Sequence, residues 1–118
     1  NQYGYMGKYQ FGMSTLQSIG MYVSREEFLN NPDLQEEAML KNLARNKRIL
    51  SKYITYYDGR IVNGVFITEA GILAGAHLAG PGGVKRFFNK GFDFSDGNGT
   101  KLTTYMSEFK NFTFFIGS

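Results

Sequence analysis

The chain has 118 residues, carries a formal net charge of +3 and contains 11 Phe, 8 Tyr and no Cys. This length suffices for one hydrophobic core, so we expect residues 1–118 to form a single domain. The lack of Cys excludes disulfides, thiol catalysis and thiolate metal sites, and no apolar run in the sequence approaches the roughly 18 residues of a membrane span.

Two short helices are predicted near the start of the chain. Residues 14–19 have a helical pattern that Gly20 ends, because glycine readily adopts the left-handed conformation that closes a helix. Ser24, with Glu27 following at capping-box spacing, is typical of the start of a second helix. Both helices are expected to be brief.

A long helix is predicted from Pro32 to about Tyr56. Asn31 is a good N-cap, and proline suits the first helical position because the N–H that it lacks has no partner there. Acidic residues in the first turn complement the positive end of the helix dipole. Asp58 and Gly59 are expected to end the helix.

This helix is basic on one side and apolar on the other. The basic residues are Lys41, Arg45, Arg48 and Lys52. The apolar residues opposite them are Met39, Leu43, Leu50 and Ile54. The pattern predicts a solvated face, and the alternative is attraction to an anionic polymer such as the cell wall. No recognised motif accompanies the charge, so we expect no nucleic-acid partner.

Residues 60–67 place apolar side chains around Asn63 and Gly64. Asn-Gly is a frequent pair in two-residue hairpin turns, so the segment is either a small β-hairpin or a connecting loop. We favour the loop.

Thr68 is expected to cap a helix that carries small and apolar residues on one face. That face consists of Ile72, Leu73, Ala76 and Ala79. Glycine weakens a helix and proline interrupts one, so Gly80 and Pro81 are expected to end this helix, with another beginning at Val84. The prediction is a helix-turn-helix corner with a bare backbone.

A further helix is predicted from about Thr100 to Lys110. Its inward residues are Leu102, Tyr105, Met106 and Phe109. The preceding loop, residues 93–99, is rich in Asp, Asn and Gly, which favour turns through their own backbone chemistry. Calcium binding is the alternative, but the loop lacks the EF-hand spacing and its final glutamate in register.

The corner segment, residues 76–84, reads Ala-His-Leu-Ala-Gly-Pro-Gly-Gly-Val. It resembles the Ala-Tyr-Asn-Ala-Gly-Pro-Gly-x-Val signature of soluble lytic transglycosylases and goose-type lysozymes, which cut the glycan strands of peptidoglycan. His77 and Leu78 stand where that family usually has Tyr and Asn.

Two earlier segments resemble the same family, and all three occur in family order. Residues 7–12 read Gly-Lys-Tyr-Gln-Phe-Gly and are similar to the Gly-x-x-Gln element that lines the sugar groove. Residues 31–35 open a long helix with Asn-Pro, as a similar segment does in the family. Segments 7–10 and 76–80 are therefore expected to line one groove.

The resemblance implies a mostly α, lysozyme-like domain with a substrate groove. It also implies cleavage between N-acetylmuramic acid and N-acetylglucosamine, either by water or by the lytic route that leaves a 1,6-anhydro product. In the family a single glutamate suffices for the lytic route, and no cofactor is expected. The implied location is the cell envelope or periplasm, the exterior of the cell, or a phage particle.

Four residues are expected to bind the substrate: Tyr9, Gln10, His77 and Tyr105. The Gln10 amide can donate to and accept from sugar groups, and tyrosine rings can stack on sugar faces. The alternatives are a surface amide for Gln10 and core positions for the tyrosines. His77, by resemblance, takes the Tyr position that faces the catalytic glutamate, and the alternative is a satisfied histidine within a helix. It is the only histidine, so we expect no metal site.

Glycoside cleavage needs a carboxylic acid beside the scissile oxygen. The resemblance places it in a Glu-Ser or Glu-Gly pair ahead of the Gly-x-x-Gln element, and no acid precedes Gly7 in this sequence. We therefore expect the acid upstream of residue 1, which would make the chain N-terminally truncated. Glu69 is the internal alternative, although acids favour helix N-termini for a separate, dipolar reason.

The alternative function is a non-catalytic peptidoglycan-binding or structural domain of a phage or envelope apparatus. The missing glutamate supports it. Under both hypotheses the expected partners are peptidoglycan glycan strands, within a larger protein or assembly.

Overall fold

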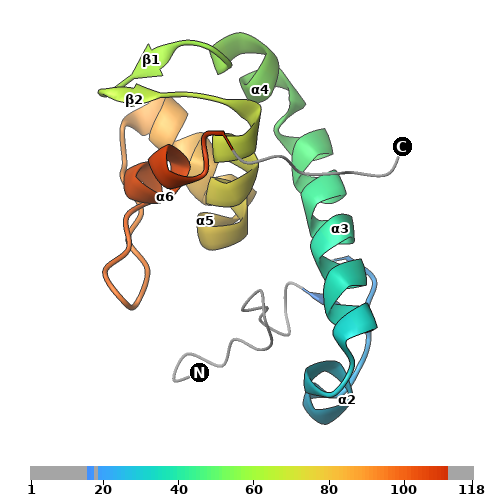
Figure 1. Cartoon of the computed structure of the whole chain (residues 1–118). Coiled ribbons are helices and arrows are strands. Elements are labelled where there is room, and N and C mark those ends of the chain that lie inside the picture. The colour runs from blue at the N-terminus through green and yellow to red at the C-terminus, as the bar shows by residue number, and fades with distance from the viewer. Residues whose placement is uncertain (1–15, 18, 112–118) are drawn as a thin grey trace. The chain divides into compact units, whose positions relative to one another are not determined.

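The computed structural model describes residues 16–17 and 19–111 (Figure 1). These residues are mostly helical, as predicted, and they also form one small antiparallel hairpin. The helices are α2 (Arg25–Leu29), α3 (Pro32–Ile49), α4 (Ser51–Tyr57), α5 (Glu69–Lys90) and α6 (Leu102–Glu108). The strands are β1 (Ile61–Val62) and β2 (Val65–Phe66). The described residues divide into two compact parts, one before residue 46 and one from residue 46 onward.

Side-chain caps begin the helices of the first part where the sequence predicts them. Ser24 Oγ accepts the Glu27 N–H at 3.0 Å at the start of α2. Asn31 Oδ1 accepts the N–H groups of Asp33 and Leu34 at 3.1 and 3.2 Å, so it caps α3. Each cap satisfies N–H groups that have no partner within the helix.

A small apolar cluster forms the core of this part. Its buried members are Leu16, Met21, Phe28 and Ala38. Gln35, only 8% exposed, joins α3 to α2 because its Nε2 donates to the Phe28 carbonyl at 3.1 Å. A buried amide without such a partner would destabilise the fold, because it would lose its hydrogen bonds to water and gain none in return.

The predicted long helix is interrupted at Leu50, so the prediction of one helix to Tyr56 is wrong. Leu50 has φ −100° and ψ 11°, which separates α3 from α4. The hydrogen bonds continue across the break, since the Leu50 N–H donates to the Asn46 carbonyl and the Ile54 N–H to the Leu50 carbonyl, both at 2.9 Å. The apolar period is helical on both sides, so local sequence does not mark this one-residue bend.

Residues 61–66 form a hairpin, so the loop that we favoured is wrong. Ile61 pairs with Phe66 and Val62 with Val65. Asn63 and Gly64 both have positive φ, 49° and 79°, which is the backbone that a two-residue primed turn requires.

Helix α5 is bent where the glycine and proline predict a corner. Gly80 has φ 74° and ψ 162°, so it leaves the helical conformation, and the helix resumes at Pro81 rather than at Val84. Proline is tolerated there because it occupies the first position of the resumed helix. Gly91, with φ 71°, closes α5 in the left-handed conformation.

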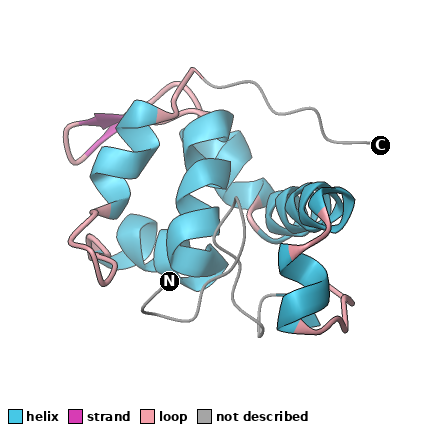
Figure 2. Ribbon diagram, turned by 60° about the horizontal axis from the view of Figure 1, so that its bottom comes forward, coloured by secondary structure: helices cyan, strands magenta, loops and turns pink. Residues whose placement is uncertain are grey.

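Helices α5 and α6 pack side by side, and glycines permit the close approach (Figures 1 and 2). A Cβ on Gly71 would lie 2.9 Å from the Met106 carbonyl oxygen, and a Cβ on Gly75 would lie 2.6 Å from Leu102 Cδ1. Leu102 and Met106 are buried in this interface. The two glycines therefore serve packing between helices.

The loop before α6 is held by aspartate side chains. Asp96 Oδ1 accepts the N–H groups of Asn98 and Thr100 at 2.9 and 2.7 Å. Asp93 accepts the Thr103 N–H at 3.1 Å and the Thr103 hydroxyl at 2.7 Å. The carboxylates are thus used in turns and in capping α6, as the turn interpretation predicts.

Candidate functional site

The corner in α5 carries glycines whose surroundings are open within the described part of the chain. Among residues 16–17 and 19–111, no heavy atom lies within 4 Å of a Cβ built on Gly80 or on Gly82. Gly71 and Gly75 differ, because their missing Cβ atoms make room for α6. Gly71 and Gly75 of α5 therefore allow helix packing, whereas Gly80 and Gly82 have no such packing role within the described residues.

His77 lies in α5 one helical turn before Gly80 and is half-buried. The preceding residues, Gly75 and Ala76, are buried, whereas residues 77–81 are half-buried. This location places an imidazole beside the bare corner. Its role as a sugar or carboxyl contact stays a prediction.

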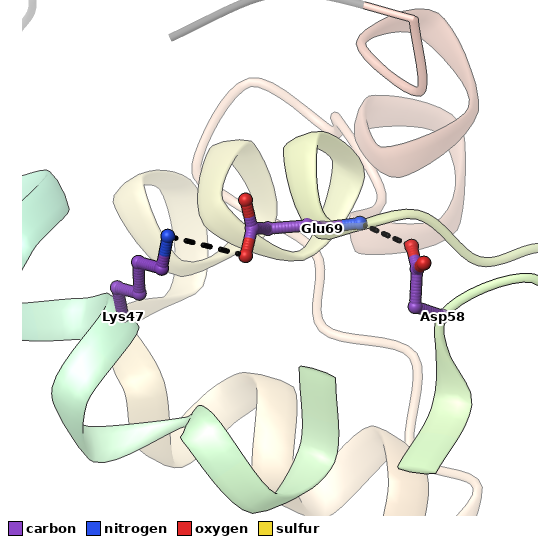
Figure 3. A network of polar contacts seen from close by, with 3 residues as sticks. All are labelled: Lys47, Asp58 and Glu69. Atoms are coloured by element: carbon purple, nitrogen blue, oxygen red, sulfur yellow. Dashed lines mark hydrogen bonds and ion pairs between the residues drawn. The ribbon is translucent and has the colours of Figure 1, made fainter. Parts of the chain in front are cut away.

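Glu69 is the first residue of α5 and takes part in a polar network that secures the start of the helix (Figure 3). Its Oε1 lies 3.4 Å from Lys47 Nζ, and the two side chains are 44% and 49% exposed. Its backbone N–H donates to Asp58 Oδ1 at 2.9 Å. Thr68 Oγ1 accepts the Gly71 N–H at 3.0 Å in the same turn, as predicted for a cap.

Glu69 and His77 lie at the two ends of the first half of α5. The rise of an α-helix separates them by about 12 Å along the axis, which is too far for direct contact. The Glu69 carboxylate instead contacts Lys47, and this is the arrangement of a helix-start residue.

Tyr105 lies on α6, is half-buried, and has its ring centroid 4.6 Å from that of Phe109. Burial raises the pKa of its hydroxyl, and the carboxylates of Glu108 and Asp96 raise it further. The hydroxyl therefore stays protonated over a wide pH range and is able to donate a hydrogen bond.

A shallow depression of about 450 Å³ lies on α6 and β2. Its lining residues are Val65, Thr103, Thr104, Ser107 and Glu108. This depression was not predicted from the sequence. The signal for it is that the hydroxyl residues of α6 recur at helical spacing on the side away from Leu102 and Met106. Neither His77 nor Tyr105 lines it.

Two predicted site residues, Tyr9 and Gln10, lie outside the described residues. The predicted groove between residues 7–10 and residues 76–80 therefore stays a prediction. Within residues 16–17 and 19–111, no three His, Cys, Asp or Glu side chains gather where they could hold a metal ion. No helix in that same part of the chain is long and apolar enough to cross a membrane.

Comparison of this chain with known protein families, curated proteins and solved structures finds no match. The functional assignment therefore depends on the chemistry of its residues and on the motif resemblance.

Proposed function

We propose that this chain is part of a domain that binds and cleaves the glycan strands of peptidoglycan, in the manner of lytic transglycosylases and goose-type lysozymes. The observation that carries the proposal is the corner at Gly80. The residues that resemble the family signature, 76–84, contain a helix break with φ 74° at Gly80. No described residue lies within 4 Å of a Cβ built on Gly80 or Gly82. Packing within the described chain does not account for these two glycines.

A linear polysaccharide that binds at such a corner must be able to reach the protein backbone. Sugar hydroxyl and N-acetyl groups hydrogen-bond to main-chain N–H and C=O groups, and a side chain at Gly80 or Gly82 would stand in their way. His77, one turn earlier, adds an imidazole that can donate or accept a hydrogen bond. Tyr9 and Gln10 complete the proposed substrate groove, with the protonated Tyr105 hydroxyl as a further donor.

The general acid of this proposal comes from a segment ahead of Gly7 rather than from Glu69. The Glu69 carboxylate contacts Lys47 at the start of α5, and its distance from the corner argues against protonation of a glycosidic oxygen bound there. The proposed location is the cell envelope or periplasm, the exterior of the cell, or a phage particle, because the substrate is found there.

A non-catalytic peptidoglycan-binding domain is the second candidate, and one observation favours it. Four of the carboxylates of residues 46–111 have structural partners. Asp58 bonds the Glu69 N–H and Glu69 contacts Lys47, while Asp93 and Asp96 bond groups of the loop and of α6. Such a domain would keep the groove and bind glycan without cutting it.

Muropeptide analysis of digested, purified peptidoglycan separates these possibilities. The samples are residues 1–118, the same chain with Glu69→Gln, and a version extended upstream through any Glu-Ser or Glu-Gly pair. We expect cleavage by the extended version and little by the other two, because a positioned acid contributes roughly 10²–10⁴-fold.

Two other results would change the assignment. Robust cleavage by the short chain that Glu69→Gln abolishes would make Glu69 the catalytic acid. Glycan binding without cleavage in all three samples would establish the non-catalytic candidate.

A further inference from the structure

Four aromatic rings form a continuous group on α4 and the second half of α5, which we call the aromatic cluster: Tyr53, Tyr56, Tyr57 and Phe88. The Tyr57 and Phe88 rings are stacked with centroids 4.2 Å apart and an interplanar angle of 8°. Tyr53 stacks on Phe88 at 5.7 Å, and Tyr56 meets Tyr57 edge to face at 4.8 Å. Each ring therefore contacts at least one other.

The cluster lies at the surface rather than in the core. Tyr56 is 58% exposed, whereas Phe87, which adjoins the cluster in sequence, is 1% exposed and belongs to the core. Tyr53, Tyr57 and Phe88 are half-buried. Aromatic residues that gather in one place and remain partly accessible are typical of a binding surface.

Contacts within the cluster occupy several ring faces. The Tyr57 and Phe88 rings cover one another, and the Arg60 guanidinium lies 4.5 Å from the centre of the Tyr56 ring. Tyr53 Oη accepts a hydrogen bond from Asn89 Nδ2 at 2.9 Å, so its own proton remains to be donated. Ring faces of the cluster are thus partly occupied, while the Tyr53 hydroxyl can still donate a hydrogen bond.

The charges beside the cluster are positive. Lys52 precedes Tyr53 in α4, Arg60 follows α4, and Lys85 lies one turn before Phe88 in α5. No ion pair within the described part of the chain involves these three cations. The acid of the same segment, Asp58, uses its carboxylate to cap α5. A ligand that carries carboxylates would find a complementary surface here.

We propose that the aromatic cluster and its cations bind a carboxylate-bearing region of the peptidoglycan strand, at a site separate from the α5 corner. The tyrosine hydroxyls pair with sugar hydroxyl and amide groups, and Lys52, Arg60 and Lys85 attract the carboxylates of the lactyl and peptide groups. The inference rests on the proposed function. A single-stranded nucleic acid fits less well, because its bases bind by stacking on free ring faces.

Co-sedimentation of residues 1–118 with purified peptidoglycan sacculi tests this site. Two variants alter it: Tyr56→Ala, and Lys52→Gln combined with Lys85→Gln. The matched controls are Tyr22→Ala, which truncates a tyrosine that is 78% exposed elsewhere, and Lys101→Gln combined with Lys110→Gln, which removes two exposed charges at the ends of α6. Circular dichroism confirms that each variant keeps its helix content.

We expect each cluster variant to lose on the order of tenfold in affinity for sacculi at low ionic strength, while both controls bind like the unsubstituted chain. The lysine effect should vanish at high salt, where exposed charges are screened. Chitin, which has the sugar groups without carboxylates, should bind more weakly and respond to Tyr56→Ala but not to the lysine variant.

Three results would overturn the inference. If the cluster variants bind sacculi as well as the controls do, the site is wrong while the proposed function stands. If the unsubstituted chain binds a thymidine oligonucleotide but no sacculi, and the cluster variants lose that binding, the surface is a nucleic-acid site. If the unsubstituted chain binds neither polymer, both the site and glycan binding by this chain are wrong.

Discussion

The Asp58 side chain, at the end of α4, accepts the backbone N–H of Glu69 at 2.9 Å and so helps to begin α5 (Figure 3). The hairpin lies between these two residues in the sequence, so its fold brings the carboxylate to the helix N-terminus. A carboxylate at that position satisfies a free N–H and complements the positive end of the helix dipole.

We predict that Asp58→Ala destabilises the chain by about 1 kcal/mol, because the Glu69 N–H loses its acceptor. Denaturant unfolding measures the change. Asp58→Asn is the control, since an amide oxygen can still accept the hydrogen bond and should restore much of the loss. Equal losses in the two variants would show that charge, and not the hydrogen bond, is what stabilises the helix start.

Gly80→Ala is expected to cost about 1–3 kcal/mol, because the φ of 74° at this position is strained for any residue with a Cβ. Gly82→Ala should change stability by less than about 0.5 kcal/mol, since a methyl group there meets no atom of the described residues within 4 Å. Thermal unfolding of the pair tests the difference. Similar melting temperatures would show that the corner relaxes easily around Gly80.

Removal of the carboxylate in Glu69→Gln should destabilise the chain by less than about 1 kcal/mol, because the ion pair with Lys47 is exposed and water screens it. Thr68→Ala is the comparison and should cost about 1–2 kcal/mol, since Thr68 Oγ1 accepts the Gly71 N–H and donates to the Lys110 carbonyl. Chemical denaturation ranks the two variants. A larger loss for Glu69→Gln would reveal a structural role beyond the ion pair.

Stability is expected to fall at alkaline pH in part through Tyr105. Burial, together with Glu108 and Asp96, raises the pKa of its hydroxyl in the folded chain, so folding favours the protonated form. The resulting stabilisation is fully present below the usual tyrosine pKa and is lost as pH rises through the raised value. Unfolding measured across this range should be less pH-dependent in Tyr105→Phe, with Tyr22→Phe as the exposed control. An identical pH profile in all three chains would contradict the prediction.

Local sequence determined where three of the helices begin and where α5 is broken. Ser24, Asn31 and Thr68 act as caps in the structure because a side-chain oxygen a few residues from a free N–H needs no tertiary contact to reach it. Gly80 breaks α5 for an equally local reason, since glycine alone adopts its φ without strain. Such features depend on covalent geometry and short-range hydrogen bonds.

The remaining features of the fold depend on tertiary structure. The bend at Leu50 interrupts a pattern that stays helical on both sides, and the hairpin at Asn63 could equally have been a loop. The aromatic cluster joins α4 to Phe88 across more than thirty residues, and no helical period relates such distant positions. The sequence also did not indicate which glycines serve packing. Gly75 and Gly82 differ only because α6 packs against Gly75 in the folded chain. Contacts between residues that meet only after folding cannot be predicted from a local pattern, because their energy depends on how the whole chain folds.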